Sequence, residues 1–316
     1  MIVVHTDRPS QGGRRRELLA VMAIVLLVSV FPVDLFPSAP QGSRGIDGQF
    51  SGRQGQVLVV RVAPQGPSAE VVGKFLGRTI PFFGEPGLGG ATGYTALVGI
   101  DMQDVPGTHE LLVETKGPGG AQRLSYHVLV LKEKFPIQHL TLPKDMVDLD
   151  EATLARVKAE QEQVRVVLGT VTPERRWTAG FIEPVQGTIS GAFGRMRRIN
   201  GQPRSPHNGE DIAAEAGTAV LATNDGIARL IVDHYFSGKG VFLDHGLGLH
   251  SMYFHLSEIL VHDGEPVARG QVIGKVGASG RATGPHLHWG VRLNGARVDP
   301  YALLHLSFNG VKTAGH

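Results

Sequence analysis

The sequence predicts a mainly β protein, with an N-terminal β-sandwich-like domain, a helical connector and a C-terminal antiparallel β-sheet domain. Three observations favour this fold class. The 316 residues include 43 glycines and 19 prolines, and 41% are hydrophobic while 19% are charged, a balance typical of turn-rich β proteins. Short apolar runs separated by Gly and Pro recur along most of the chain. A single segment shows the apolar period of about 3.6 residues that predicts a helix.

Changes in composition divide the chain into six regions, as expected for two domains with connecting segments. They are an N-terminal signal peptide or short membrane anchor (1–37), a flexible linker (38–55), the β-sandwich-like domain (56–135), the helical connector (136–176), the C-terminal domain (177–308) and a C-terminal tail (309–316).

The first region has the pattern of a targeting segment. Arginines at positions 14–16 precede an apolar run over 18–31. A helix that spans a bilayer needs about 20 residues, so this shorter run fits a secretory signal peptide better. Pro37 is a poor fit to a cleavage site, so an uncleaved membrane anchor through residues 18–33 remains the alternative. Both alternatives predict export.

Composition also excludes several classes of partner and cofactor. The formal net charge is only +2, and basic residues are not interleaved with aromatic ones as in nucleic-acid channels, so we expect no nucleic-acid partner. The chain has no cysteine, which excludes disulfides, iron–sulfur clusters and thiolate zinc sites. Any metal ion must therefore be held by His and carboxylate side chains.

The next two regions differ in texture. Residues 38–55 are rich in Gly, Ser and Gln, which predicts a flexible tether. Short strand-like runs then follow at the spacing of a small antiparallel sandwich. These runs are 56–63, 69–77, 94–101, 108–115 and 122–131.

The connector contains the predicted helix. Asp148 with Glu151 three residues later resembles a capping arrangement, and Gly169 marks the end. Apolar residues recur on one face, which we expect to pack against a neighbouring element. They are Leu154, Val157, Val164 and Val167.

The C-terminal region is a series of strands and glycine turns, and ten of the 14 histidines lie beyond residue 200, which locates the chemistry there. Asn294 and Gly295 form a two-residue hairpin signal. In the strand around "HLHWGVRL", alternation places His286 and His288 on one face, shared with Arg292, and the apolar residues on the other.

Two residue pairs in this region predict a metal site. His207 and Asp211 are four apart, but Pro206 and Gly209 disfavour a helix, and a fully extended chain would separate them by about 13 Å. We therefore expect the chain to curl, with Gly209 providing the freedom. The H-x-H pair can offer one imidazole to a metal and another to a reacting group. Two histidines, one carboxylate and an open fourth position are the composition of a catalytic zinc site.

Three stretches resemble the M23 (lysostaphin/LytM-type) zinc metallopeptidases, which cut peptidoglycan peptides. They are "ISGAFGRM" with "SPHNGEDIAAEAGTAVLATNDGIARL", "VFLDHGLGLHSMYFHLSEI" and "GQVIGKVGASGRATGPHLHWGVRLNGARVDP", within residues 178–305. The resemblance implies that His207, Asp211 and His288 are zinc ligands. It implies that His286 and His255 flank the reacting water, one as general base and the other as oxyanion stabiliser. We favour His286 as the base, and the sequence leaves this division open.

The resemblance implies an exported zinc metalloendopeptidase that hydrolyses peptide bonds in peptidoglycan stem peptides or cross-links. The upstream region also resembles the β-rich module that precedes such domains in exported proteins of Gram-negative bacteria, so we expect the periplasm or the outer face of the cytoplasmic membrane. The alternative is a non-catalytic regulator or activator of other wall hydrolases, but here no ligand of the family pattern is missing. Which bond is cut and the oligomeric state stay open.

Four further residues carry weaker expectations. Arg292 shares the histidine face and could bind a substrate carboxylate. His245 and His250 flank a hairpin and could line the cleft or orient a ligand. Asp299 is expected to cap the end of the last strand.

Overall fold

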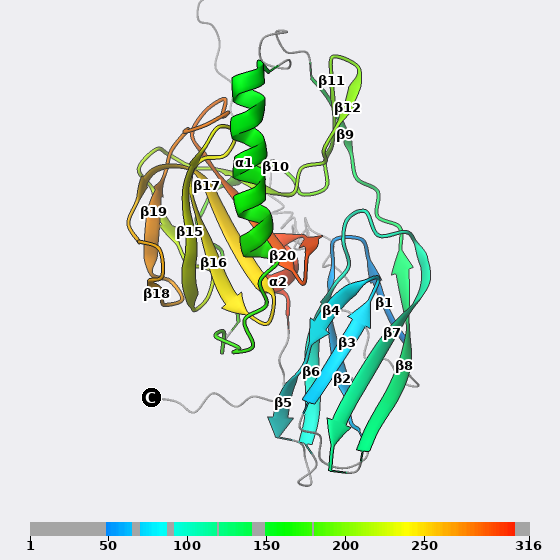
Figure 1. Cartoon of the computed structure of the whole chain (residues 1–316). Coiled ribbons are helices and arrows are strands. Elements are labelled where there is room, and N and C mark those ends of the chain that lie inside the picture. The colour runs from blue at the N-terminus through cyan, green and yellow to red at the C-terminus, as the bar shows by residue number, and fades with distance from the viewer. Residues whose placement is uncertain are drawn as a thin grey trace, which may run out of the picture. The chain divides into compact units, whose positions relative to one another are not determined.

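The structure, a computed structural model, describes residues 49–64, 70–86, 92–118, 120–140, 149–178 and 180–306. Within them the chain is mainly β-strands in largely antiparallel sheets (Figure 1), so the predicted fold class is confirmed. The predicted signal peptide or anchor (1–37), residues 38–48 of the predicted linker and all of the predicted tail (309–316) fall outside the described residues. No helix in the described ranges combines the length and apolar character needed to cross a bilayer.

Two sheets build the N-terminal part. One has five strands in the order β1 (Gln49–Arg53), β8 (Gly120–Leu131), β7 (Gly107–Gly117), β3 (Glu70–Phe75) and β4 (Arg78–Pro81). The other has the order β2 (Val57–Val62), β6 (Thr92–Gly99) and β5 (Phe83–Pro86). Alternating apolar residues of both sheets form one core, which is the predicted sandwich arrangement. They include Phe50, Val60, Ile80, Val98, Leu111 and Val128.

Strand β1 lies inside the range that the sequence predicts to be a flexible linker. Its five residues pair in parallel with the end of β8, and Phe50 is buried in the sandwich core. A Cβ on Gly52 would lie only 2.8 Å from Ile100 and from Leu58, so this glycine is packed tightly as well. For residues 49–53 the linker prediction is therefore corrected. Composition alone could not reveal a strand whose partner lies far along the chain.

The connector contains a strand as well as a helix. Strand β9 (Ile137–Leu140) pairs in parallel with β11 (Met196–Ile199), which pairs antiparallel with β12 (Gln202–Arg204). The backbone N–H of Met196 also donates to Pro136 O, at 2.9 Å. The chain before the helix is thereby joined to a hairpin that leaves the C-terminal sheet next to the candidate site.

Helix α1 (Glu151–Leu168) begins two residues later than the sequence predicts. Its N-cap is Asp150, whose side chain accepts a hydrogen bond from Thr153 N at 2.8 Å, so the predicted Asp148 cap is wrong. The helix ends at Gly169, as predicted. Val164 of the predicted face packs, with Leu168, against an apolar cluster of the C-terminal sheet, so the helix does pack on a neighbour. Leu154 is 43% exposed, so the start of the predicted face is not part of this contact. That cluster consists of Val232, Phe242 and Met252.

The C-terminal sheet is antiparallel throughout. Its main path runs β10 (Thr188–Gly191), β13 (Gly209–Ala213), β20 (His286–Leu293), β17 (Leu249–Ile259), β16 (Gly238–Gly246), β15 (Gly226–His234) and β18 (Pro266–Val267). Strands β14 (Ala219–Leu221), β19 (Val272–Val276) and β21 (Ala296–Val298) pair off this path, and α2 (Pro300–Leu304) follows. The Asn294–Gly295 hairpin is confirmed: both residues have positive φ, 52° and 81°, as a type I′ turn requires.

The two faces of strand β20 differ as its alternation predicts. Leu287, Trp289 and Val291 are fully buried in the main core of the sheet. His286 and His288 lie on the opposite face, where His288 is the cross-strand neighbour of Phe254 on β17. Helix α1 and its apolar cluster cover part of that second face (Figure 1). The helix therefore packs on the same face of the sheet as these histidines.

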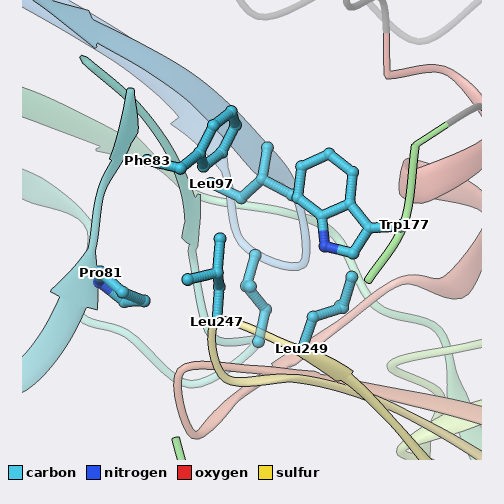
Figure 2. Close-up of a pocket in the computed structure, with 7 residues that line it drawn as sticks. Pro81, Phe83, Leu97, Trp177, Leu247 and Leu249 are labelled. Atoms are coloured by element: carbon cyan, nitrogen blue, oxygen red, sulfur yellow. The ribbon is translucent and has the colours of Figure 1, made fainter. Parts of the chain in front are cut away.

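Residues of the sandwich also pack against the C-terminal sheet. Phe83 and Leu97 line a small apolar pocket together with Trp177, Leu247 and Leu249 (Figure 2). Hydrogen bonds reinforce this contact: Asn294 Nδ2 donates to Leu97 O, and the Arg297 guanidinium binds Asp101 at 2.6 and 2.9 Å. Because residues 294 and 297 belong to the β20–β21 hairpin, these contacts hold the strand that carries His286 and His288.

Candidate metal centre

Three predicted ligand residues converge at one point of the C-terminal sheet. Asp211 on β13 is directly opposite His288 on β20, and His207 lies just before β13. His207 Nε2 lies 3.0 Å from Asp211 Oδ1 and 3.1 Å from His288 Nδ1, which is 2.7 Å from the same carboxylate oxygen. Among the described residues, this is the one group of His, Asp and Glu donors close enough to hold a metal ion.

The path of the chain at this site differs from the predicted curl. Gly209 belongs to the extended strand β13 and has no positive φ. Residues 205–208 have no regular secondary structure, and the backbone of His207 is held there by hydrogen bonds to Arg195 O and from Gly194 N. As predicted, the segment is not helical. The irregular segment ends before Gly209, so the predicted need for a flexible glycine does not explain this position.

Gly209 provides space for the side chains of the candidate ligands. A Cβ on Gly209 would lie 2.7 Å from His288 Nε2 and 2.5 Å from Trp289 O. A Cβ on Gly191, which pairs with Asp211, would lie 2.4 Å from the Asp211 carboxylate. Both glycines therefore leave room for the side chain of a candidate ligand on a neighbouring strand.

Hydrogen bonding and stacking orient the rings of the two candidate histidine ligands. His207 Nδ1 donates to Ala192 O at 3.0 Å, which directs Nε2 towards Asp211. The ring of Phe254 stacks on His288 with 12° between the planes and 5.7 Å between the centroids. A backbone acceptor on the far nitrogen is the usual support for a metal-ligating histidine, since it fixes both ring orientation and tautomer.

The electrostatics of the site favour a cation. Burial opposes ionisation of Asp211, but the imidazole nitrogens of His207 and His288, 3.0 and 2.7 Å from its Oδ1, outweigh it and hold the pKa of this carboxyl well below its usual range. An ionised carboxylate beside two imidazoles is a donor set for a divalent metal ion. The side chain of Glu210, next in the strand, points to the other face, where burial raises its pKa to about 8.

The two predicted catalytic histidines lie beside this group. The rings of His255 and His286 are 4.7 Å apart between centroids, and His286 Nε2 lies 3.9 Å from Asp211 Oδ1. His286 Nδ1 lies 2.8 Å from Gly284 O, and His255 Nδ1 lies 2.8 Å from Ser279 O. Each ring therefore donates through Nδ1, which leaves Nε2 as the basic nitrogen.

His255 has an unusual backbone conformation. Its φ of 63° is in the left-handed region, which costs a non-glycine residue free energy and persists where surrounding contacts hold it. The backbone N–H of His255 donates to Ser237 O at 2.9 Å, which ties it to the loop before β16. Burial lowers the pKa of His255 to about 4, so the ring is neutral near pH 7.

The four weaker expectations have different outcomes. His245 faces the core, where it bonds Asp225 O and Ser251, so it does not line the site. His250 is buried and is the cross-strand neighbour of Arg292. Arg292 is four residues from His288 along β20, so both residues lie about 13 Å from His288 along the strand. Asp299 does cap, but its side chain accepts from Tyr301 N at the start of helix α2.

Sequence reasoning missed two contributors to the site. Phe254 stacks on the ring of His288, a candidate ligand, and Glu210 supports the turn at 192–195 through a hydrogen bond from Phe193 N at 2.9 Å. Both residues are adjacent in sequence to residues of the predicted site, in the stretches "FH" and "GED". Nothing in the spacing showed which backbone group or ring each side chain would contact.

Comparisons with known proteins identify the family. The family model described as peptidase family M23 matches residues 205–300, which include all three converging donors and both further histidines. The crystal structure of a Pseudomonas aeruginosa protein assigned to peptidase M23 is 33% identical to this chain. The match covers 79% of this chain and 93% of the other, with a TM-score of 0.60. The chain belongs to peptidase family M23.

Curated relatives match over the C-terminal part. Peptidoglycan DD-endopeptidase ShyA of Vibrio cholerae is 43% identical over 95 residues, which cover 30% of this chain and 22% of the relative. DD-carboxypeptidase/endopeptidase Mpg of Neisseria meningitidis is 42% identical over 127 residues, 39% of this chain and 29% of the relative. The chain thus aligns with less than a third of the length of either relative.

Proposed function

We propose that this chain is a zinc metalloendopeptidase that hydrolyses peptide bonds in peptidoglycan stem peptides or cross-links. The observation that carries the proposal is the convergence of His207, Asp211 and His288 with two further histidines beside them. The name of the relative ShyA, a peptidoglycan DD-endopeptidase, supports peptidoglycan as the substrate, and the name of Mpg supports endopeptidase chemistry. The masses of the released muropeptides will identify the peptide bond that is cut.

The donor set fits zinc. Zinc takes imidazole nitrogens and carboxylate oxygens at about 2.0 to 2.2 Å, which places the donors of one tetrahedral ion about 3.3 to 3.6 Å apart. The three donor atoms here lie 2.7 to 3.1 Å apart, so small side-chain shifts would let them share an ion. Three protein ligands leave a fourth position for substrate or water. Zinc bound there would supply Lewis-acid chemistry, polarising a carbonyl and acidifying water.

His286 and His255 would then have separate roles in proton transfer and oxyanion stabilisation. His286 shares a strand face with ligand His288, and its Nδ1 is anchored to Gly284 O, so its Nε2 is the proposed general base. It would take a proton from the attacking water and pass it to the leaving amine. His255, anchored to Ser279 O, would hydrogen-bond the developing oxyanion. General acid–base assistance of this type is worth about 10²- to 10⁴-fold in rate.

The remaining sequence predictions belong to the same proposal. Residues 1–37 would export the domain as a signal peptide or retain it as an anchor, and the predicted site of action is the periplasm or the outer face of the cytoplasmic membrane. A peptidoglycan substrate supports this location, because cell-wall peptides lie outside the cytoplasm. The boundaries 56–135, 136–176 and 177–308 are proposed for the sandwich, connector and peptidase regions, with the sandwich extended to include β1.

The test is to incubate the purified protein with peptidoglycan sacculi and identify the released muropeptides by mass spectrometry, with zinc content measured in parallel. We expect His288→Ala to lose both zinc and activity, and His286→Ala to keep zinc but lose most turnover. Activity that survives in both variants would refute the assignment. A zinc-loaded wild type that releases no muropeptide, but stimulates another wall hydrolase, would support the regulator alternative.

A further inference from the structure

One peptide group of the turn at 192–195 links a buried carboxyl to a proposed metal ligand. The N–H of the Ala192–Phe193 peptide donates to Glu210 Oε1 at 2.9 Å. The C=O of the same peptide accepts from His207 Nδ1 at 3.0 Å. A continuous hydrogen-bonded path therefore runs from Glu210 through a single peptide unit to the far nitrogen of the His207 ring.

The path is shielded from water and braced on both sides. Glu210, Phe193 and His207 are each at most 6% exposed. The backbone of His207 is bonded to the same turn, by its N–H to Arg195 O and by its C=O to Gly194 N. Glu210 and Asp211 are consecutive in β13 and point to opposite faces. One strand thus provides a ligand on one face and the support for a second ligand on the other.

Stability alone does not account for a carboxyl at this position. Glu210 Oε2 is buried with no hydrogen-bond partner among the described residues. A buried polar atom without a partner costs free energy, and an apolar side chain of the same size would avoid that cost. What the carboxyl does provide is Oε1, the acceptor for Phe193 N.

We propose that Glu210 is a positioning residue for the metal centre, which acts through the Ala192–Phe193 peptide to orient His207. The inference rests on the proposed function, because it assigns His207 as a ligand. Hydrogen bonds in a chain polarise one another, so an acceptor on the peptide N–H strengthens the peptide C=O as acceptor for His207 Nδ1. Support of that nitrogen tunes both the orientation and the basicity of a metal-ligating imidazole.

Three variants separate the acceptor from charge and packing. Glu210→Gln keeps a carbonyl oxygen for Phe193 N, Glu210→Met keeps the length without an acceptor, and Glu210→Asp keeps the carboxyl but withdraws it by one methylene. Zinc affinity is measured by chelator competition on the full chain. The His207 Nδ1–H proton is followed by nitrogen-edited NMR, and circular dichroism of the metal-free protein verifies folding.

We expect the Gln variant to bind zinc within about threefold of wild type, and the Met and Asp variants to bind it about tenfold more weakly. The Nδ1–H resonance should move upfield in Met and Asp but stay near its wild-type position in Gln. If the Glu210→Met variant does not fold, the comparison of Glu210→Asp with Glu210→Gln decides the outcome. Equal affinity in all variants, or a loss in Gln as large as in Met, would overturn the inference. A wild type that binds no zinc would instead refute the proposed function.

Discussion

The space at Gly209 gives a quantitative prediction. In Gly209→Ala, the new Cβ would lie 2.5 Å from Trp289 O and 2.7 Å from His288 Nε2, whereas ordinary contacts begin at about 3.4 Å. Strands β13 and β20 must therefore separate by about 0.9 Å there, and the His288 ring must retreat by about 0.7 Å. The backbone oxygen cannot rotate away as a flexible side chain could, so the ligand has to shift.

A shift of this size acts on the metal centre directly. We expect Gly209→Ala to bind zinc at least about tenfold more weakly, equivalent to about 1.4 kcal/mol, because His288 no longer meets Asp211 in its present geometry. At saturating zinc, muropeptide release should fall about 100-fold, the typical consequence of misplacing a catalytic group by about 1 Å. Zinc affinity is measured by chelator competition, and turnover by chromatography of released muropeptides.

Gly180→Ala is the matched control. Among the described residues, leaving aside the chain neighbours of Gly180, no heavy atom lies within 4 Å of the Cβ it would add, and Gly180 has no positive φ, so this variant makes the same chemical change without a clash. It should behave as wild type in both assays. If Gly209→Ala also binds zinc as tightly as wild type and keeps its turnover, the argument that Gly209 makes room for His288 is wrong.

Two further predictions concern stability. Burial lowers the pKa of His245 to about 4, so as pH falls from about 6.5 the unfolded chain takes up the proton first, and up to about 3 kcal/mol of stability is lost by pH 4. Urea unfolding over this range should show the loss in wild type and a flatter curve in His245→Gln; parallel curves would contradict it. Separately, Arg297→Met should lower the free energy of unfolding by about 2 kcal/mol, because its ion pair with Asp101 is largely shielded from water. A double-mutant cycle with Asp101→Asn that shows no coupling would exclude that contribution.

Much of the fold was predictable because it follows local rules. The alternation in His286–Leu293 placed the histidines on one face and the apolar residues in the core, and Asn294–Gly295 predicted a turn that the backbone adopts. The candidate site was predictable through the family motifs, and the structure brings His207, Asp211 and His288 together. Their roles in metal binding and catalysis stay predictions until the variants are measured.

Where the predictions failed, the missing information was a contact over long sequence separation or a small local shift. Residues 49–53 have linker composition but gain a parallel partner in β8, and the helix cap lies at Asp150, two residues beyond the predicted one. Boundaries of this kind depend on which nearby side chain reaches an unpaired backbone N–H, and several candidates in one segment have similar chemistry.

The sequence by itself determined the periodicity, the turns and the types of donor available for a metal, because each follows from the chemistry of neighbouring residues. Only the tertiary structure decided that Gly209 serves His288 as empty space, and that Glu210 reaches the peptide beside His207. Both depend on the register between strands. A shift of one residue would turn every side chain to the opposite face, so these roles exist only once the whole sheet has assembled.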